Sequence, residues 1–345
     1  MKLVMLWTDM LVWLLVIVLL LWSWVISRSP QIKKLWQTIF RSHIAMASSV
    51  VLLFYLLFTM LDSIHLRLEL PLKLQKVEEV RYEVEIVSVL DIIFEHSIQN
   101  TERTYSAPFA TVEYASSIVV DENGITQQVH LPLKYVSKDN GFIGESLSAF
   151  STGLFLSFLL VSLHIWWRDR SRFILTFKET WRGESNLPWR TAYVTFILLA
   201  VGFTWLYMLS YSYHVLGTDK VGGDVLYQSF KSIRTGVLIG ILTTLIMLPV
   251  AVILGVSAGL FGGWVDDVIQ YLYTTLSSIP GVLLIAAGVL SMQVMMDNNP
   301  SWFETTLERS DLRLLFLILI LGITSWTGLC RLLRAETLKI SQMEF

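Results

Sequence analysis

Seven long apolar runs limit the folds that this chain can adopt. A lipid bilayer offers no partner for backbone N–H and C=O groups, so a segment of about 20 apolar residues that crosses it must be helical. The composition agrees, because 54% of the 345 residues are apolar and 16% are charged, against roughly 25% charged in soluble domains. The sequence therefore predicts an all-α polytopic membrane protein. The expected helices lie near 3–26, 45–65, 147–167, 191–212, 235–259, 269–292 and 313–331.

Basic loops indicate how these helices are oriented. Lys and Arg concentrate in the loops 28–44 and 168–190, and short basic loops are retained in the cytoplasm. This pattern predicts an external N-terminus, external segments 66–146 and 213–234, and a cytoplasmic C-terminus. The first run has no small-x-small cleavage site, so it predicts an uncleaved anchor rather than a signal peptide.

The segment 66–146 differs from the apolar runs in its pattern of polar and apolar residues. Polar and apolar residues alternate in RYEVEIVSV, 81–89, which predicts a half-buried strand. In SIVVDENGITQQVHL, Asn123 and Gly124 provide the residues that a tight hairpin turn favours. We expect a small α+β or mostly-β extracytoplasmic domain inserted between the second and third helices. Such a domain would either contact a solute-binding protein or cap the helix bundle, and both interpretations stay open here.

Short motifs follow one another between Leu216 and Phe345. The stretch GTDKVGGD precedes the fifth run, which ends in AGLFGGWVD; the sixth run carries SSIPGVLL, and the seventh continues into SWTGLCRLLRAETLKISQMEF. In this order, the motifs resemble the permease subunit of a dipeptide/oligopeptide-type ABC importer. The chain departs from that family at Gly223, Tyr271 and Thr274, where Arg, Arg and Asp are usual. It also stops before the family's Glu-Ala-Ala loop, so we expect an incomplete protein.

The resemblance implies a transport function without covalent chemistry. A permease of this type conducts a small solute by alternating access, with peptide as the first expectation and metal chelates or sugars still open. The implied partners are a second permease subunit, two cytoplasmic ATP-binding subunits and a periplasmic solute-binding protein, in a bacterial inner membrane. This chain has no Gly-x-x-x-x-Gly-Lys-Ser/Thr phosphate loop. We therefore expect ATP and Mg to bind the partner subunits, and we expect no cofactor, enzymatic activity or nucleic-acid partner for this chain.

Three groups of residues are candidates for functional roles. The external loop motif comprises Gly217, Thr218, Asp219, Gly222 and Asp224, whose two carboxylates are expected to fix the loop by accepting backbone N–H bonds. The residues expected to face the ATPase are Gly262, Gly263, Asp266, Arg331, Arg334 and Glu336. For the two arginines, anchoring the helix to lipid headgroups is the alternative. The expected lining or gate of the pathway comprises Ser277, Ser278 and Pro280.

Proline and glycine positions suggest how the helices bend and pack. Pro249 and Pro280 each remove a backbone donor within an apolar run and predict kinks, which neighbouring Ser side chains can compensate. At Pro280 the kink is either a gate or purely structural. The pairs Gly236/Gly240 and Gly255/Gly259 predict close helix packing, because membrane helices approach through small residues four positions apart.

Other classes of protein explain less of the chain. We divide it into a two-span hairpin, 1–65; the external domain, 66–146; a third span with its basic loop, 147–190; and an incomplete permease-like part, 191–345. A membrane-anchored sensor or scaffold would explain the first three runs but not the motif series.

Ion-coupled transport and hydrolysis are disfavoured. Asp9, Asp62 and His164 lie near the ends of runs rather than deep within them. No hydrolase motif is present. The spacing of His65, His96 and His130 matches no metal site, so they are expected to be scattered surface residues.

Overall fold

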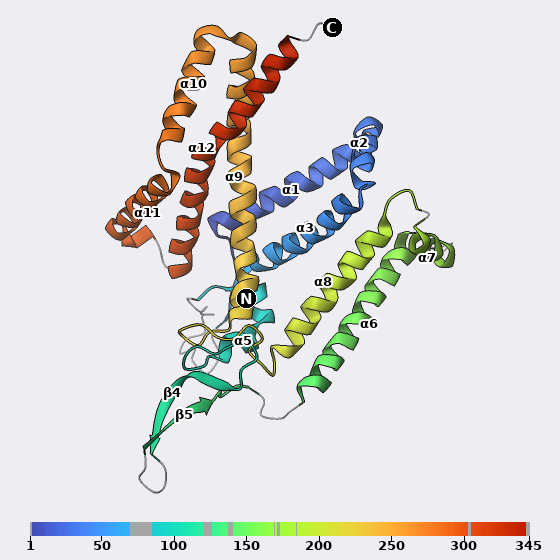
Figure 1. Ribbon diagram of the computed structural model, residues 1–345, viewed down its shortest axis with the longest axis vertical. Helices are drawn as coiled ribbons and strands as arrows, with labels where there is room; N and C mark the ends of the chain where they lie inside the picture. The colour runs from blue at the N-terminus through green and yellow to red at the C-terminus, as the bar shows by residue number, and fades with distance from the viewer. Residues whose placement is uncertain are drawn as a thin grey trace. The chain divides into compact units, whose positions relative to one another are not determined.

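The membrane-length helices among the described residues agree in number with the seven apolar runs. The computed structural model describes residues 2–69, 85–120, 126–136, 141–168, 170, 173–183, 185–302 and 305–342. Within these residues, seven helices are long and apolar enough to cross a membrane, so the chain is a multi-pass membrane protein. They are α1 (Trp7–Arg28), α3 (His43–Asp62), α6 (Phe142–Arg168), α8 (Trp189–Leu209), α9 (Val225–Phe261), α11 (Gly281–Asn298) and α12 (Thr306–Ser341) (Figure 1).

Helices α9 and α12 are much longer than the apolar runs within them. Helix α9 has 37 residues and α12 has 36, because apolarity marks only the part that can face lipid, whereas helical hydrogen bonding continues into the polar flanks. A capping box begins α12: the Glu308 N–H donates to the Thr305 hydroxyl at 3.2 Å, and the Thr305 N–H donates to the Glu308 carboxylate at 3.3 Å. These two bonds satisfy donors that a helix start otherwise leaves without partners.

The prediction of one continuous helix over 269–292, the sixth span, is wrong. The structure divides it into α10 (Gly263–Ser278) and α11 (Gly281–Asn298). Ile279 is extended, with φ −83° and ψ 126°, as the steric restriction on a residue before proline favours. Pro280 precedes the first residue of α11 and has no backbone N–H to donate. Pro280 therefore separates two helices instead of kinking one, whereas Pro249 lies inside the continuous helix α9.

The chain folds into two compact units. The first comprises Met1–Ile17, Asp62–Val89 and Arg234–Phe345, and the second comprises Val18–Leu61 and Leu90–Ile233. Both α1 and α9 therefore contribute residues to each unit.

In the first unit, α9 packs against α10 and α12. Their shared core includes Ala251 and Ala258 of α9, Tyr273 of α10, and Trp326 and Cys330 of α12. A Cβ added at Gly255 would lie 2.9 Å from the Cys330 carbonyl oxygen, and one at Gly259 would lie 2.5 Å from Thr337 Cβ. The close packing predicted for this glycine pair is thus confirmed.

The other glycine pair on α9 does not pack in this way. A Cβ added at Gly236 or Gly240 would meet nothing within 4 Å among the described residues. The close contact predicted for this pair is therefore absent from the part of the chain that the structure describes.

A small antiparallel sheet also belongs to the first unit. Its strands are β1 (Lys2–Val4), β2 (His65–Arg67) and β3 (Val87–Ser88), in that order. The strand expected over 81–89 is thus shorter, because Val89 already begins the helix α4 (Val89–Ile93); residues 81–84 lie outside the described residues. The first apolar run likewise begins as a strand rather than as a helix.

The second unit is built on the helix pair α6 and α8, which run side by side (Figure 1). A Cβ added at Gly153 of α6 would lie 3.2 Å from the Cα of Val201 in α8, so only glycine permits this approach without a shift. The short helices α2 (Pro30–Phe40) and α7 (Phe173–Arg182) occupy the two basic loops. A further short helix, α5 (Glu95–Gln99), follows α4.

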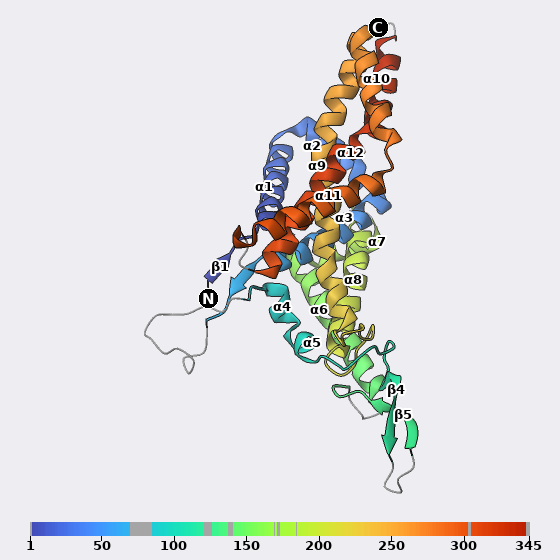
Figure 2. The ribbon, with the colours of Figure 1, turned by 90° about the vertical axis from the view of Figure 1, so that its left-hand side faces the viewer.

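The predicted hairpin is present in the second unit. Strands β4 (Val112–Val120) and β5 (Thr126–Pro132) pair antiparallel as a two-stranded ribbon (Figure 2). Asn123 and Gly124, which were expected to form its turn, lie outside the described residues. The segment 66–146 is divided between the two units, with β2 and β3 in the first and β4 and β5 in the second.

Candidate functional site

The external loop motif closes onto a distant segment of the second unit. Gly217 and Gly222 have φ values of +77° and +80°, a conformation that glycine adopts without steric cost. The carbonyl of Gly222 accepts a 2.9 Å bond from the Glu102 N–H. Thr218 pairs with Ser106 through its backbone, and its hydroxyl donates to the Thr104 carbonyl at 2.8 Å. The motif therefore anchors the loop to residues more than 100 positions earlier in the chain.

Asp219 organises the loop internally. Its carboxylate accepts bonds of 2.9 Å from the backbone N–H groups of Val221 and Gly223, and a 2.8 Å bond from the Gln228 side chain. The Gln228 bond, followed by that from Gly223, lowers the pKa of Asp219 below its usual value, because hydrogen bonds to the charged form favour that form. The carboxylate thus accepts backbone N–H bonds within the loop, as the sequence predicted.

Asp224 caps the start of α9 and belongs to a buried polar chain. It accepts a 3.1 Å bond from the Tyr227 N–H, in the position where a carboxylate complements the helix dipole. Its other oxygen lies 2.8 Å from Nδ1 of His214, whose Nε2 is 3.7 Å from the Glu102 carboxylate. Glu102 in turn accepts the backbone N–H groups of Lys134 and Tyr135, at 3.0 and 2.8 Å. This series of polar contacts joins the loop, α9 and the segment that follows β5.

A second group of candidate residues surrounds the turn between α9 and α10, in the first unit. Gly262 and Gly263 form that turn with φ values of +58° and +54°. In the first turn of α10, Asp266 accepts two bonds from Arg334 of α12, from Nε and Nη2, both at 2.5 Å. This fork-like pairing fixes the direction of the guanidinium as well as its distance. Glu336 lies further along α12, exposed, and is 3.9 Å from Lys339.

Of the residues expected at the gate, Ser277 and Ser278 end α10 and Pro280 precedes α11, and Ser277 contacts α12. Arg331 donates a 2.9 Å bond to the Ser277 hydroxyl, and its guanidinium lies 5.1 Å from the centre of the Tyr273 ring. Ser278 donates to the Thr275 carbonyl at 2.7 Å. Ser278 therefore satisfies a carbonyl in the last turn of α10, next to the break at Pro280. Ser277 links the predicted gate with the arginine-bearing helix α12.

Sequence reasoning missed a buried cluster of charged side chains in the first unit. Asp9 of α1, His65 of β2, Arg234 of α9 and Asp311 of α12 form it, with side-chain exposures of 0%, 2%, 11% and 3%. Arg234 Nη2 is 2.7 Å from Asp9 Oδ1 and 3.7 Å from Asp311 Oδ1, and His65 Nδ1 is 2.8 Å from Asp9 Oδ2. The expectation that His65 is a surface residue is therefore wrong.

Thr8 links Asp311 with Arg234 in this cluster. Its backbone N–H donates to Asp311 at 3.0 Å and its hydroxyl donates to the same carboxylate. That hydroxyl also accepts a 2.6 Å bond from Arg234, while the Leu6 N–H donates to Asp9 at 3.0 Å. The only sequence signal was the position of Asp9, Arg234 and Asp311 near the ends of apolar runs. Among the described residues, no group of three His, Cys, Asp or Glu side chains has the arrangement of a metal site.

Comparison with known proteins gives partial matches to one class. The chain is 27% identical over 132 residues to the oligopeptide transport system permease protein OppC of Mycobacterium tuberculosis, covering 38% of this chain and 40% of that protein. It is 33% identical over 125 residues to OppC of Lactococcus lactis, covering 36% and 37%. It is 24% identical over 186 residues to the glutathione transport system permease protein GsiD of Pectobacterium atrosepticum, covering 49% and 56%.

These matches bear on the resemblance drawn from the motifs. The chain spans between 37% and 56% of the length of these three relatives, and the OppC matches are close in length to the stretch 216–345 that carries the motifs. Similarity to peptide-type permease subunits is thereby confirmed. No family model matches the chain, and no solved structure matches it.

Proposed function

We propose that the chain is a permease subunit of an ATP-driven ABC importer and forms half of a membrane conduit. The observation that carries the proposal is the similarity to permease subunits named for oligopeptide, dipeptide and glutathione transport. Seven helices able to cross a membrane support it. From the same names, we propose a peptide or peptide-like cargo, moved from the periplasm to the cytoplasm by alternating access.

The proposal includes the partners that the conduit requires. These are a second permease subunit, two cytoplasmic ATP-binding subunits that hold ATP and Mg, and a periplasmic solute-binding protein. The basic loops favour an inner-membrane topology with the N-terminus outside and the C-terminus in the cytoplasm. In that topology, the α9–α10 turn and the end of α12 face the cytoplasm. The Asp266–Arg334 pair, which ties these two elements together, is then the part of this chain that presents a fixed surface to an ATP-binding subunit.

Co-purification tests the proposal directly. The tagged complete protein, expressed with its native neighbours and solubilised in detergent, is expected to retain an ATP-hydrolysing subunit. Arg334→Gln is expected to lower that retention roughly tenfold, because it removes a bidentate charged contact that orients the docking surface. The readout is the ATPase activity and the stoichiometry of the purified complex.

A matched control separates docking from folding. Arg313→Gln changes an exposed arginine near the other end of the same helix and is expected to leave retention unchanged. Because the Asp266–Arg334 pair is partly exposed, its loss is expected to cost no more than about 1 kcal/mol of stability. A wild-type protein that retains no ATP-hydrolysing subunit under any detergent condition would contradict the proposed function.

We also propose that the break between α10 and α11 gates the conduit. Pro280→Ala allows a helix to continue through 279–280, and we expect it to slow solute uptake several-fold while leaving the amount of assembled complex unchanged. Pro249→Ala is the control, because Pro249 already lies inside a continuous helix. The measurement is the initial rate of uptake of a radiolabelled peptide. Equal rates for wild type and Pro280→Ala would remove the gate from the proposal.

A further inference from the structure

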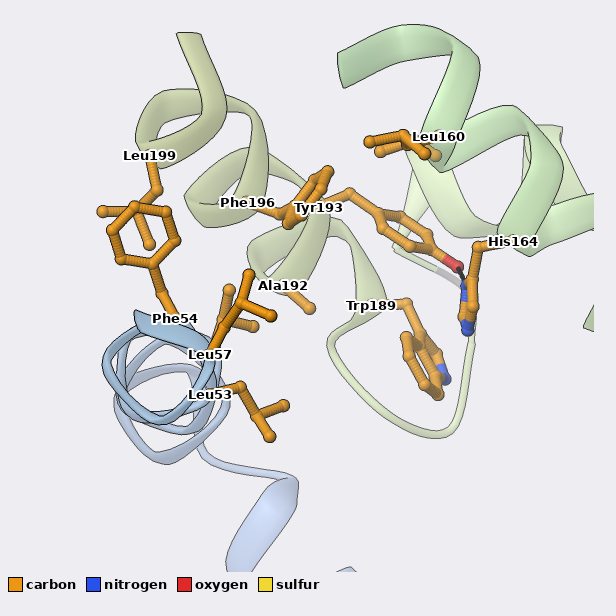
Figure 3. A pocket seen from close by; sticks show the side chains of 12 residues that line it. Leu53, Phe54, Leu57, Leu160, His164, Trp189, Ala192, Tyr193, Phe196 and Leu199 are labelled. Carbon is orange, nitrogen blue, oxygen red and sulfur yellow. Dashed lines mark hydrogen bonds between the residues drawn. The ribbon is translucent and has the colours of Figure 1, made fainter. Parts of the chain in front are cut away.

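An apolar pocket of about 500 Å³ lies in the second unit between α3, α6 and α8. Its volume lies within the range of small-molecule sites, about 300–1,000 Å³. Figure 3 shows Leu53, Phe54 and Leu57 of α3 on one side and residues of α6 and α8 on the other. Leu53, Leu57 and Leu160 are 64%, 53% and 47% exposed. The pocket is therefore open at the outer surface of these helices, where lipid surrounds a membrane protein.

The polar groups of the pocket gather at one end. His164 Nδ1 lies 2.9 Å from the Tyr193 hydroxyl, with Trp189 beside them (Figure 3). The guanidinium of Arg168, the last residue of α6, lies over the Trp189 ring at 4.7 Å from its centre. Among the described residues, no carboxylate forms a salt bridge with Arg168. A positive charge thus sits at the mouth of an otherwise apolar cavity without an acidic partner in that part of the chain.

Several features place this end at the level of lipid headgroups. Four tryptophans of the second unit lie in or beside the segment between α6 and α8: Trp166, Trp167, Trp181 and Trp189. Indole rings favour the boundary between hydrocarbon and headgroups. Helix α7 buries Thr176 and Thr180 but exposes Ile174, Leu175 and Trp181, so its outer face carries apolar side chains. A helix with such a face beside basic residues is typical of the membrane interface.

We propose that this pocket binds an anionic phospholipid, with an acyl chain between α3, α6 and α8 and the phosphate at Arg168. An unbranched hydrocarbon chain matches walls that are apolar along their length, and a phosphate matches a guanidinium that forms no salt bridge with a described carboxylate. A water-soluble ligand would leave most of these apolar walls without a hydrophobic partner. The site lies in the second unit and involves none of the residues assigned to transport, so it does not depend on the proposed function.

Native mass spectrometry of the full chain tests the headgroup. The protein is taken from nanodiscs that contain equal amounts of phosphatidylglycerol and phosphatidylcholine with identical acyl chains. Wild type is expected to retain phosphatidylglycerol over phosphatidylcholine by roughly fivefold, and Arg168→Gln to remove most of that preference. Arg170→Gln is the matched control, because Arg170 lies over Trp166, which does not line the pocket; its preference is expected to equal that of wild type.

A second pair of variants tests the acyl chain. Leu160→Trp fills the pocket and is expected to reduce retention of both lipids. Leu156→Trp changes an equally exposed leucine one turn earlier on α6 that lies outside the pocket, and retention is expected to be unchanged. Equal retention of the two lipids by wild type overturns the proposal without reliance on any variant. Identical lipid profiles for Arg168→Gln and Arg170→Gln in folded protein overturn the role of Arg168.

Discussion

Replacing Arg234 with Met is expected to destabilise the first unit by about 3–5 kcal/mol, the usual cost of breaking a buried ion pair by removing one partner. Methionine keeps most of the apolar stem of arginine but removes the donors that reach Asp9, Thr8 and Ser63. Two carboxylates, Asp9 and Asp311, would then remain buried without their cation. The measurement is unfolding of the detergent-solubilised protein by heat or denaturant, followed by circular dichroism.

Two comparisons give the result a specific meaning. Arg313→Met removes an exposed arginine from α12 and is expected to change stability by less than about 0.5 kcal/mol, as surface substitutions usually do. Adding Asp9→Asn to Arg234→Met is expected to recover part of the lost stability, because one of the uncompensated charges is removed. An Arg234→Met protein as stable as Arg313→Met would show that the cluster does not stabilise the unit.

The cluster also connects the start of the N-terminal helix with the permease-like part of the chain. Asp9 lies in α1, within the part of the sequence that was assigned to a separate two-span hairpin. Its partners lie in α9 and α12, which belong to the permease-like part. The start of α1 is therefore a structural component of the same compact unit as the permease-like helices. Truncation of residues 1–17 would remove Asp9 and Thr8, leaving Arg234 without its two closest partners.

The number of helices could be predicted because the membrane imposes a local rule. About 20 apolar residues in succession predict a helix whatever the rest of the chain does, and six of the seven runs correspond to single helices. The sixth run failed because apolarity does not report backbone conformation, whereas the Ile279-Pro280 pair does. A proline inside an apolar run is compatible with a break between two helices and also with one continuous helix, since α9 continues through Pro249.

The buried cluster could not be predicted from the same local patterns. Thr8 and Asp311 are 303 positions apart, and Asp9 and Arg234 are 225 apart, so no spacing motif joins them. Each charged residue viewed alone looked like the polar end of a span. By contrast, the glycines and carboxylates of the external loop were visible because turns need particular residues at adjacent positions. Even there, the partners of the loop, Glu102 and Ser106, lie in a distant segment that the motif does not specify.

That distant contact makes Gly222 the second position where a small change is expected to have a large effect. Gly222→Ala is expected to destabilise the second unit by about 3 kcal/mol or more, from a strained positive φ together with overpacking. The added Cβ would lie 1.8 Å from the carbonyl oxygen of Glu102 and 2.4 Å from its carbonyl carbon. Both are backbone atoms, so relief requires the loop and the Glu102 segment to separate, which also breaks the 2.9 Å bond between them.

The neighbouring glycine supplies the control. A Cβ added at Gly223 would lie 2.9 Å from Nε2 of Gln228, the movable end of a flexible side chain, so Gly223→Ala is expected to cost less than about 1 kcal/mol. Hydrogen exchange at the backbone N–H groups of Glu102, Lys134 and Tyr135 measures the difference locally, because all three bonds depend on the contact between the loop and this segment. Faster exchange in Gly222→Ala than in Gly223→Ala is the expected result. Equal protection in the two variants would mean that the loop motif does not hold this segment in place, and that its glycines serve the turn alone.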